Sequence, residues 1–215
     1  PKANRLRNWE PFPVTPESID RVFLTHAHID HTGWLPRLVR DGFRGPVHCT
    51  RATADLCRIM LKDSAHLQEE DARWANKKGF SKHKPALPLY TTEDAERTLE
   101  LFEPVYYGQE YYGELPNYRV KFKDAGHILG SSFVEFKNEK GPNTRKILFS
   151  GDFGRSHQPI LKTPTQVFNV DYLILESTYG NRLHGDQHPK EEFNRVINES
   201  YKRGGVLVIP AFAVG

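Results

Sequence analysis

Residues 19–31 read IDRVFLTHAHIDH, a short apolar run that leads directly into a cluster of side chains able to bind metal. Val22, Phe23 and Leu24 are continuous apolar residues, which is typical of a buried strand, and we expect a strand over 19–25. A polar turn should follow over 26–31. It contains three histidines and one aspartate within six residues, and imidazole and carboxylate groups are ligands that zinc prefers.

The spacing within this turn predicts two metal positions. In extended backbone, residues two apart point to the same side, so His26 and His28 can hold one ion together. Asp30 and His31 follow one turn later and can face a second ion, as in hydrolytic pairs of divalent ions about 3.5–4 Å apart. A solvated loop is the alternative, and the density of ligands directly after a strand argues against it. Asp30 can also cap the next helix.

The rest of the chain alternates between helical and extended patterns. We expect helices over 32–40, 52–78, 91–102 and 190–201. The second helix should bury Leu56, Ile59, Met60 and Leu67, and Thr92 is the candidate cap of the third. Short strands are expected over 46–50, 118–122, 132–136, 146–150, 172–175 and 206–209, with a turn at 140–143 and a polar surface excursion over 62–90. Because hairpins join some strands, the pattern favours an α/β sandwich with mixed sheets over a purely parallel sheet.

The composition is that of a globular domain without a membrane segment. Of 215 residues, 38% are hydrophobic and 27% are charged, and no apolar run approaches the roughly 20 residues that span a bilayer. Residues 1–9 do not form a secretory signal. Cys49 and Cys57 are expected to be reduced thiols in a cytoplasmic protein, or a nuclear one in a eukaryote. The net charge of +3 leaves both nucleic acid and small anions open as partners.

Three motifs in order resemble the signature of the metallo-β-lactamase superfamily. They are His26-x-His28-x-Asp30-His31, then Ala125-Gly126-His127 between two strands, then Ser150-Gly151-Asp152 at the end of a strand. The resemblance implies an αββα sandwich with two Zn²⁺ ions. It assigns His26, His28 and His127 to the first ion and Asp30 and His31 to the second, with Asp152 shared.

Further segments are similar to the β-CASP branch of this superfamily, which processes nucleic acids and includes the nuclease of eukaryotic pre-mRNA 3′-end cleavage with its bacterial and archaeal relatives. They are Gly126–Ser131, Leu175–Gly180 and Pro210–Gly215. The resemblance implies a zinc-dependent phosphodiesterase that hydrolyses single-stranded RNA through a metal-bound hydroxide. Asp30 would aim the hydroxide, and Glu176, in the branch's first acidic motif, would orient a ligand or a protonated histidine. RNA is favoured over DNA because the motifs resemble the RNA-processing members more closely.

The resemblance also predicts the domain organisation. A metallo-β-lactamase domain, incomplete at both ends, is expected over 1–205, and the start of a β-CASP domain over 206–215. Because the later motif histidines would then lie beyond the chain, we expect these 215 residues alone to bind the first zinc better than the second and to cleave RNA negligibly. The candidate substrate contacts are Arg155, Tyr179, Arg182 and His184. A homo-oligomer and a processing complex are both compatible with this organisation.

Two other functions remain open. A small-molecule hydrolase of the same superfamily, such as a thioesterase or lactonase, would share every metal ligand, but a compact enzyme of that kind has no need of the segments at 176–180 and 210–215. A non-catalytic subunit of an RNA-processing complex would be expected to have lost ligands, whereas all six expected ligands are present.

Overall fold

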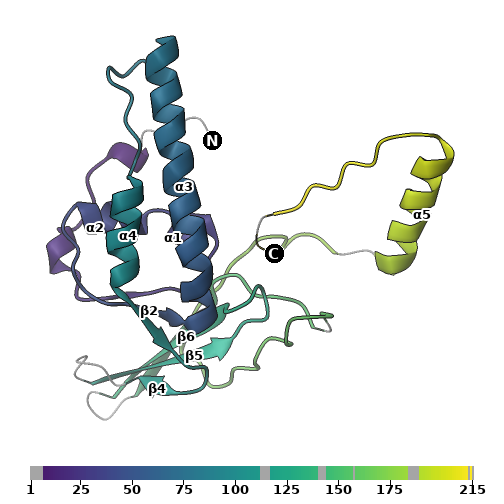
Figure 1. The fold of residues 1–215 in the computed structure, drawn as a ribbon. Coiled ribbons are helices and arrows are strands. Elements are labelled where there is room, and N and C mark those ends of the chain that lie inside the picture. Colours follow the sequence, from purple (N-terminus) through teal and green to yellow (C-terminus); the bar gives the residue numbers. More distant parts are fainter. Residues whose placement is uncertain are drawn as a thin grey trace. The chain divides into compact units, whose positions relative to one another are not determined.

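The computed structural model describes residues 7–111, 117–139, 144–156, 158–183, 189–212 and 214. The chain divides into two compact units, Pro1–Glu176 and Ser177–Gly215. Two sheets and four helices belong to the first unit, and helix α5 (Pro189–Lys202) to the second (Figure 1). Among the described residues, no helix combines the length and the apolarity needed to cross a membrane.

Both sheets of the predicted sandwich are present in the first unit. The smaller is parallel, in the order β1 (Val22–Phe23), β2 (Val47–Thr50) and β3 (Phe102–Val105). The larger has the order β4 (Glu110–Tyr111), β5 (Tyr118–Asp124), β6 (Ser132–Asn138), β7 (Arg145–Phe149) and β8 (Tyr172–Ile174). Its pairings are antiparallel except between β7 and β8, which run parallel. The predicted α/β fold with a mixed sheet is therefore confirmed.

The apolar core lies between the two sheets. Val120 and Phe122 of β5 and Val134 of β6 are buried. Phe23 of β1 packs against this cluster, and its ring meets the ring of Phe136 edge-on at 5.1 Å between centroids. Alternate residues of a strand face opposite sides of the sheet. Accordingly, a second cluster, made of Ala125, Phe133 and Leu148 with Val167 and Val170 against them, forms on the other face.

Helices α1 (Ile29–Thr32), α2 (Leu35–Arg40), α3 (Arg51–Lys78) and α4 (Thr92–Glu100) form the helical layer of the first unit, with α3 and α4 side by side (Figure 1). The buried face of α3 differs from the prediction, since Ile59 and Leu67 are 66% and 55% exposed. Its buried residues are mostly small: Thr53, Ala54, Cys57, Leu61, Ala65, Ala72 and Ala75. Small side chains allow close packing, so the larger apolar residues are left on the outside.

Other boundaries shift by a few residues. Thr91, rather than Thr92, caps α4, in a reciprocal capping box with Asp94. The helix ends at Glu100 because Phe102 already pairs with Val47 in β3. The polar turn expected over 26–31 ends in α1, and the helix expected over 32–40 is interrupted at Gly33 and Trp34.

Three further expectations concern strands, a turn and the cysteines. The strand expected over 206–209 is not formed, since this exposed stretch has no paired neighbour among the described residues and a strand needs its backbone bonds satisfied. The expected turn at 140–143 lies outside the described residues. Cys49 and Cys57 are both buried free thiols. Burial raises the pKa of Cys57 to about 12, so this thiol is unreactive at neutral pH.

Candidate metal centre

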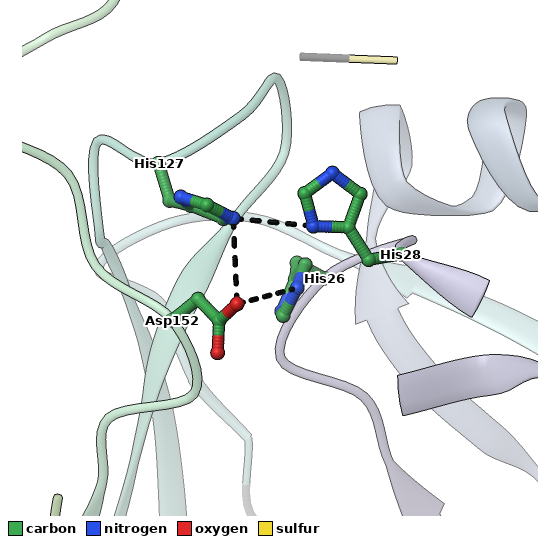
Figure 2. Close-up of side chains that lie close together, drawn as sticks. All are labelled: His26, His28, His127 and Asp152. Carbon is green, nitrogen blue, oxygen red and sulfur yellow. Dashed lines mark hydrogen bonds and ion pairs between the residues drawn. The ribbon is translucent and has the colours of Figure 1, made fainter. Parts of the chain in front are cut away.

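Side chains from three separate segments meet at one end of the first unit. His26 and His28 follow β1, His127 lies in the loop between β5 and β6, and Asp152 follows β7. One ligand atom from each of these four residues lies within 4.8 Å of the others. Figure 2 shows the three rings and the carboxylate turned toward one another. Residues far apart in the sequence therefore form one cluster.

Asp152 lies at the middle of this group. Its Oδ2 is 3.6 Å from His127 Nε2 and 3.8 Å from His26 Nε2. Its Oδ1 is 3.3 Å from His31 Nε2, and that ring is in turn 3.6 Å from Asp30 Oδ2. The two oxygens of one carboxylate thus face two different sets of side chains, and all six residues singled out by the sequence lie together.

His26 is an orphaned polar group at the base of the cluster. The side chain is fully buried, and its Nε2 has no hydrogen-bond partner among the described residues, since Asp152 Oδ2 at 3.8 Å is out of reach. Burial, assisted by the neighbouring rings of His31, His28 and His127, lowers the pKa of His26 to about 3. The ring is therefore neutral at neutral pH. A buried lone pair without a partner is costly, and a divalent metal ion fits as the missing partner.

Thr25 orients this ring from the side. Its Oγ1 is 3.1 Å from His26 Nδ1. A neutral imidazole carries one N–H. When that N–H is on Nδ1 and donates to Thr25, the Nε2 lone pair points into the cluster.

We expect Thr25→Val to weaken the binding of a metal ion such as added Zn²⁺ by about 10- to 100-fold, because the isosteric side chain cannot hold the ring or its tautomer. Zinc affinity measured by competition with a fluorescent chelator tests this, with Thr163→Val, at an exposed threonine, as the control. Equal affinity in the two variants would show that the Thr25 hydroxyl has no such role.

The three segments approach so closely that glycine is required where they touch. A Cβ added at Gly154 would lie 1.7 Å from the carbonyl oxygen of Gly126. Gly151 has φ +50°, and a Cβ there would lie 2.6 Å from the side chain of Thr25. Backbone bonds join the same segments, since Gly154 N donates to Ala125 O at 2.8 Å and Ser132 N donates to Thr25 O at 2.7 Å.

The loop that carries His127 is held by buried polar groups that the sequence analysis did not single out. Ser131 Oγ accepts hydrogen bonds from the backbone N–H of His127 at 2.9 Å and of Ile128 at 3.2 Å. Thr50 and Thr53 lie at the start of α3, and their hydroxyls donate hydrogen bonds to Gly130 O in the His127 loop. The sequence signal here is the stretch Gly126–Ser131, which resembles the β-CASP branch. That resemblance does not indicate these hydrogen bonds.

The remaining predicted site residues lie in different surroundings. Glu176 Oε1 accepts the backbone N–H of Phe153 at 2.8 Å, so it contacts the residue next to Asp152. Arg155 is exposed. Tyr179 and Arg182 belong to the second unit, where the guanidinium lies over the Tyr179 ring at 5.7 Å. His184 lies outside the described residues.

The fold and the cluster together define a class of proteins. A two-sheet α/β sandwich with His and Asp side chains gathered at the ends of its strands is the arrangement expected of a metallo-β-lactamase-type domain. Residues 11–129 match the family model described as the metallo-beta-lactamase superfamily. The chain belongs to this superfamily.

Similar proteins agree with this assignment. Ribonuclease TTHA0252 of Thermus thermophilus is 35% identical over 209 residues, which cover 97% of this chain and 43% of the ribonuclease. Transcription termination factor FttA of Methanocaldococcus jannaschii is 34% identical over 203 residues, covering 93% of this chain and 30% of that protein. The chain thus spans less than half the length of these relatives. Their names agree with the RNA-processing branch predicted from the sequence, and that resemblance is confirmed.

Among solved structures, Rm3 metallo-beta-lactamase aligns with 68% of this chain and 46% of its own, at 18% identity and a TM-score of 0.39.

Proposed function

We propose that the protein containing this chain is a zinc-dependent phosphodiesterase that hydrolyses single-stranded RNA. The observation that supports it best is the cluster of His26, His28, His127 and Asp152, within 4.8 Å of one another, around a buried imidazole nitrogen that lacks a hydrogen-bond partner among the described residues. The RNA substrate is supported by relatives named as a ribonuclease and a termination factor.

The geometry around Asp152 supports the ligand sets that the resemblance implies. His26, His28 and His127 would hold one Zn²⁺, and His31 with Asp30 the other. Asp152 suits a shared position, because Oδ2 faces the first set and Oδ1 faces His31. When bound, such an ion pair lowers the pKa of water and neutralises charge that develops on phosphoryl oxygens.

Two carboxylates have proposed roles beside the ligands. The Asp30 side chain is 75% exposed and only 3.6 Å from His31. It can therefore reach the solvent side of the cluster, where it would accept a hydrogen bond from the nucleophile and aim it. Glu176 is a positioning residue, because its carboxylate holds the N–H of Phe153 and thereby the backbone next to Asp152. Burial lowers the pKa of His127, and the carboxylates of Asp152 and, to a smaller extent, Glu176 oppose this shift.

Metal removal and restoration test the proposal. The full-length protein, purified without chelator, should contain two zinc ions per chain by elemental analysis and should cleave a labelled single-stranded RNA. Dialysis against EDTA should abolish cleavage, and added Zn²⁺ should restore it, because every proposed step needs the ions. Cleavage that survives full metal removal would refute the mechanism, and one ion or fewer at saturating zinc would refute the paired site.

A further inference from the structure

The far end of α3 carries an unusual concentration of charge. Residues 73–84, which we call the α3 tip, read RWANKKGFSKHK and contain five of the chain's 30 Lys and Arg but none of its 27 Asp and Glu. Without the tip, 25 basic and 27 acidic residues would remain, a net charge of −2 instead of +3. The tip therefore contributes +5 to a chain whose net charge is +3.

Most of these cations form no ion pair with the residues that the structure describes. Arg73 pairs with Glu70, one turn earlier on α3. Lys77, Lys78, Lys82 and Lys84 are exposed, and none forms an ion pair with any residue that the structure describes. Lys77 and Lys78 lie in the last turn of α3, where cations favour any helix C-terminus. Lys82 and Lys84 lie beyond the helix, so that explanation does not extend to them.

Two aromatic side chains stand among the lysines. Trp74 and Phe80 are 57% and 59% exposed, and their rings meet edge-on with centroids 4.8 Å apart. The chain reverses direction at Gly79, which has φ +68° and ends α3. Asn76 then ties the returning segment to the helix through two hydrogen bonds with the backbone of Ala86, at 2.9 and 2.7 Å. The exposed rings are thus held in place by the fold.

A cleft with a volume of about 810 Å³ borders the tip. Its lining includes Ala75 of the tip, Asp71 and Ala72 of the preceding turn of α3, and Asp30, which is one of the proposed metal ligands. Trp9 and Trp34 also line it. An extended molecule bound at the tip therefore has a path to the residues proposed to carry out the chemistry.

We propose that the α3 tip is a binding surface for single-stranded RNA, which holds the substrate outside the cluster while the strand runs along the cleft. This inference rests on the proposed function. Unpaired lysines suit the phosphate backbone, and exposed aromatic rings provide stacking platforms for unpaired bases. The combination matches single-stranded nucleic acid better than an acidic protein surface, which would need the charges but not the rings.

The test compares two double variants with the same change in net charge. Lys82→Gln/Lys84→Gln alters the tip, and Lys190→Gln/Lys202→Gln removes two exposed lysines of α5. Binding to the zinc-loaded full-length protein is measured by fluorescence anisotropy, with a labelled 2′-O-methyl phosphorothioate RNA that resists cleavage. Thermal melting confirms that all variants fold. A third variant, Trp74→Ala, tests the stacking surface.

At about 0.1 M salt, each phosphate that a lysine no longer neutralises should raise the Kd by roughly 5-fold, so the tip variant should raise it about 25-fold. The slope of log Kd against log salt concentration should become shallower by about 1.4. Trp74→Ala should raise the Kd by at least about 5-fold. The α5 variant should bind like the unmodified protein. On cleavable RNA, the tip variant should raise KM and leave kcat unchanged.

Equal affinity and equal salt dependence for the two double variants would overturn the proposal, as would a tip that binds only an acidic protein. Because the anisotropy does not depend on turnover, an unmodified protein that binds RNA through the tip but does not cleave it would refute the proposed function and not this inference.

Discussion

Replacing His127 by Ala is expected to lower RNA cleavage by the full-length protein at least about 10²-fold while the fold survives. The ring is one of three proposed for the first ion, and its Nε2 lies 3.2 Å from His28 Nδ1 and 3.6 Å from Asp152 Oδ2. Its loss leaves that ion with too few fixed ligands, and misplacement by about 1 Å alone can cost roughly 10²-fold in rate.

Single-turnover cleavage, zinc content and thermal melting should be measured together on the His127→Ala protein. The matched control is His66→Ala, which removes an exposed ring of α3 outside the cluster and should change none of the three. Turnover and zinc content both equal to those of the unmodified protein would remove His127 from the centre.

Gly154→Ala should have a comparable effect without touching any proposed ligand. The added methyl would lie 1.7 Å from Gly126 O, a distance that no relaxed structure holds, and the opposing atom is backbone that cannot swing aside. The segments that carry His127 and Asp152 must then separate. We expect zinc affinity to fall by about 10- to 100-fold, and the free energy of unfolding by about 1–3 kcal/mol from overpacking.

Gly205→Ala provides the control, since a Cβ there meets its nearest neighbour, Ser200 O, at 3.6 Å, an ordinary van der Waals distance. Zinc titration and chemical denaturation of both variants measure the two effects. A Gly154→Ala protein that binds zinc as tightly as the Gly205→Ala protein would show that the spacing of these segments does not control the centre.

Local pattern was sufficient for much of the fold. The continuous apolar residues 22–24 predicted a buried strand over 19–25. The strand is present as β1 but is limited to Val22–Phe23, which are half-buried at the edge of the smaller sheet. The clustered histidines after it were recognisable because their spacing is short and independent of distant parts of the chain. The order of the three motifs along the chain led to the correct superfamily. Strands β5 to β7 were found close to their observed positions, since their apolar residues are bounded by turns.

The errors arose where a neighbouring element decides the outcome. Helical spacing predicted that α3 would bury Leu56, Ile59, Met60 and Leu67. The helix instead buries a face of smaller side chains, because the elements packed against it approach closely. Residues 206–209 have the composition of a strand, but no described strand pairs with them. Periodicity records which residues are apolar, and it does not record which surface is available to cover them.

The features of the candidate site also divide into those that local sequence predicts and those that tertiary packing decides. The sequence by itself determined the kinds of side chain, because each motif is local, and the superfamily, because the three motifs follow one another in a fixed order along the chain. Only the tertiary structure showed that the two oxygens of Asp152 face different sets, that Thr25 reaches the His26 ring, and that Gly154 lies against Gly126. These interactions join segments brought together by the packing of two sheets, and their distances depend on that packing rather than on any local spacing.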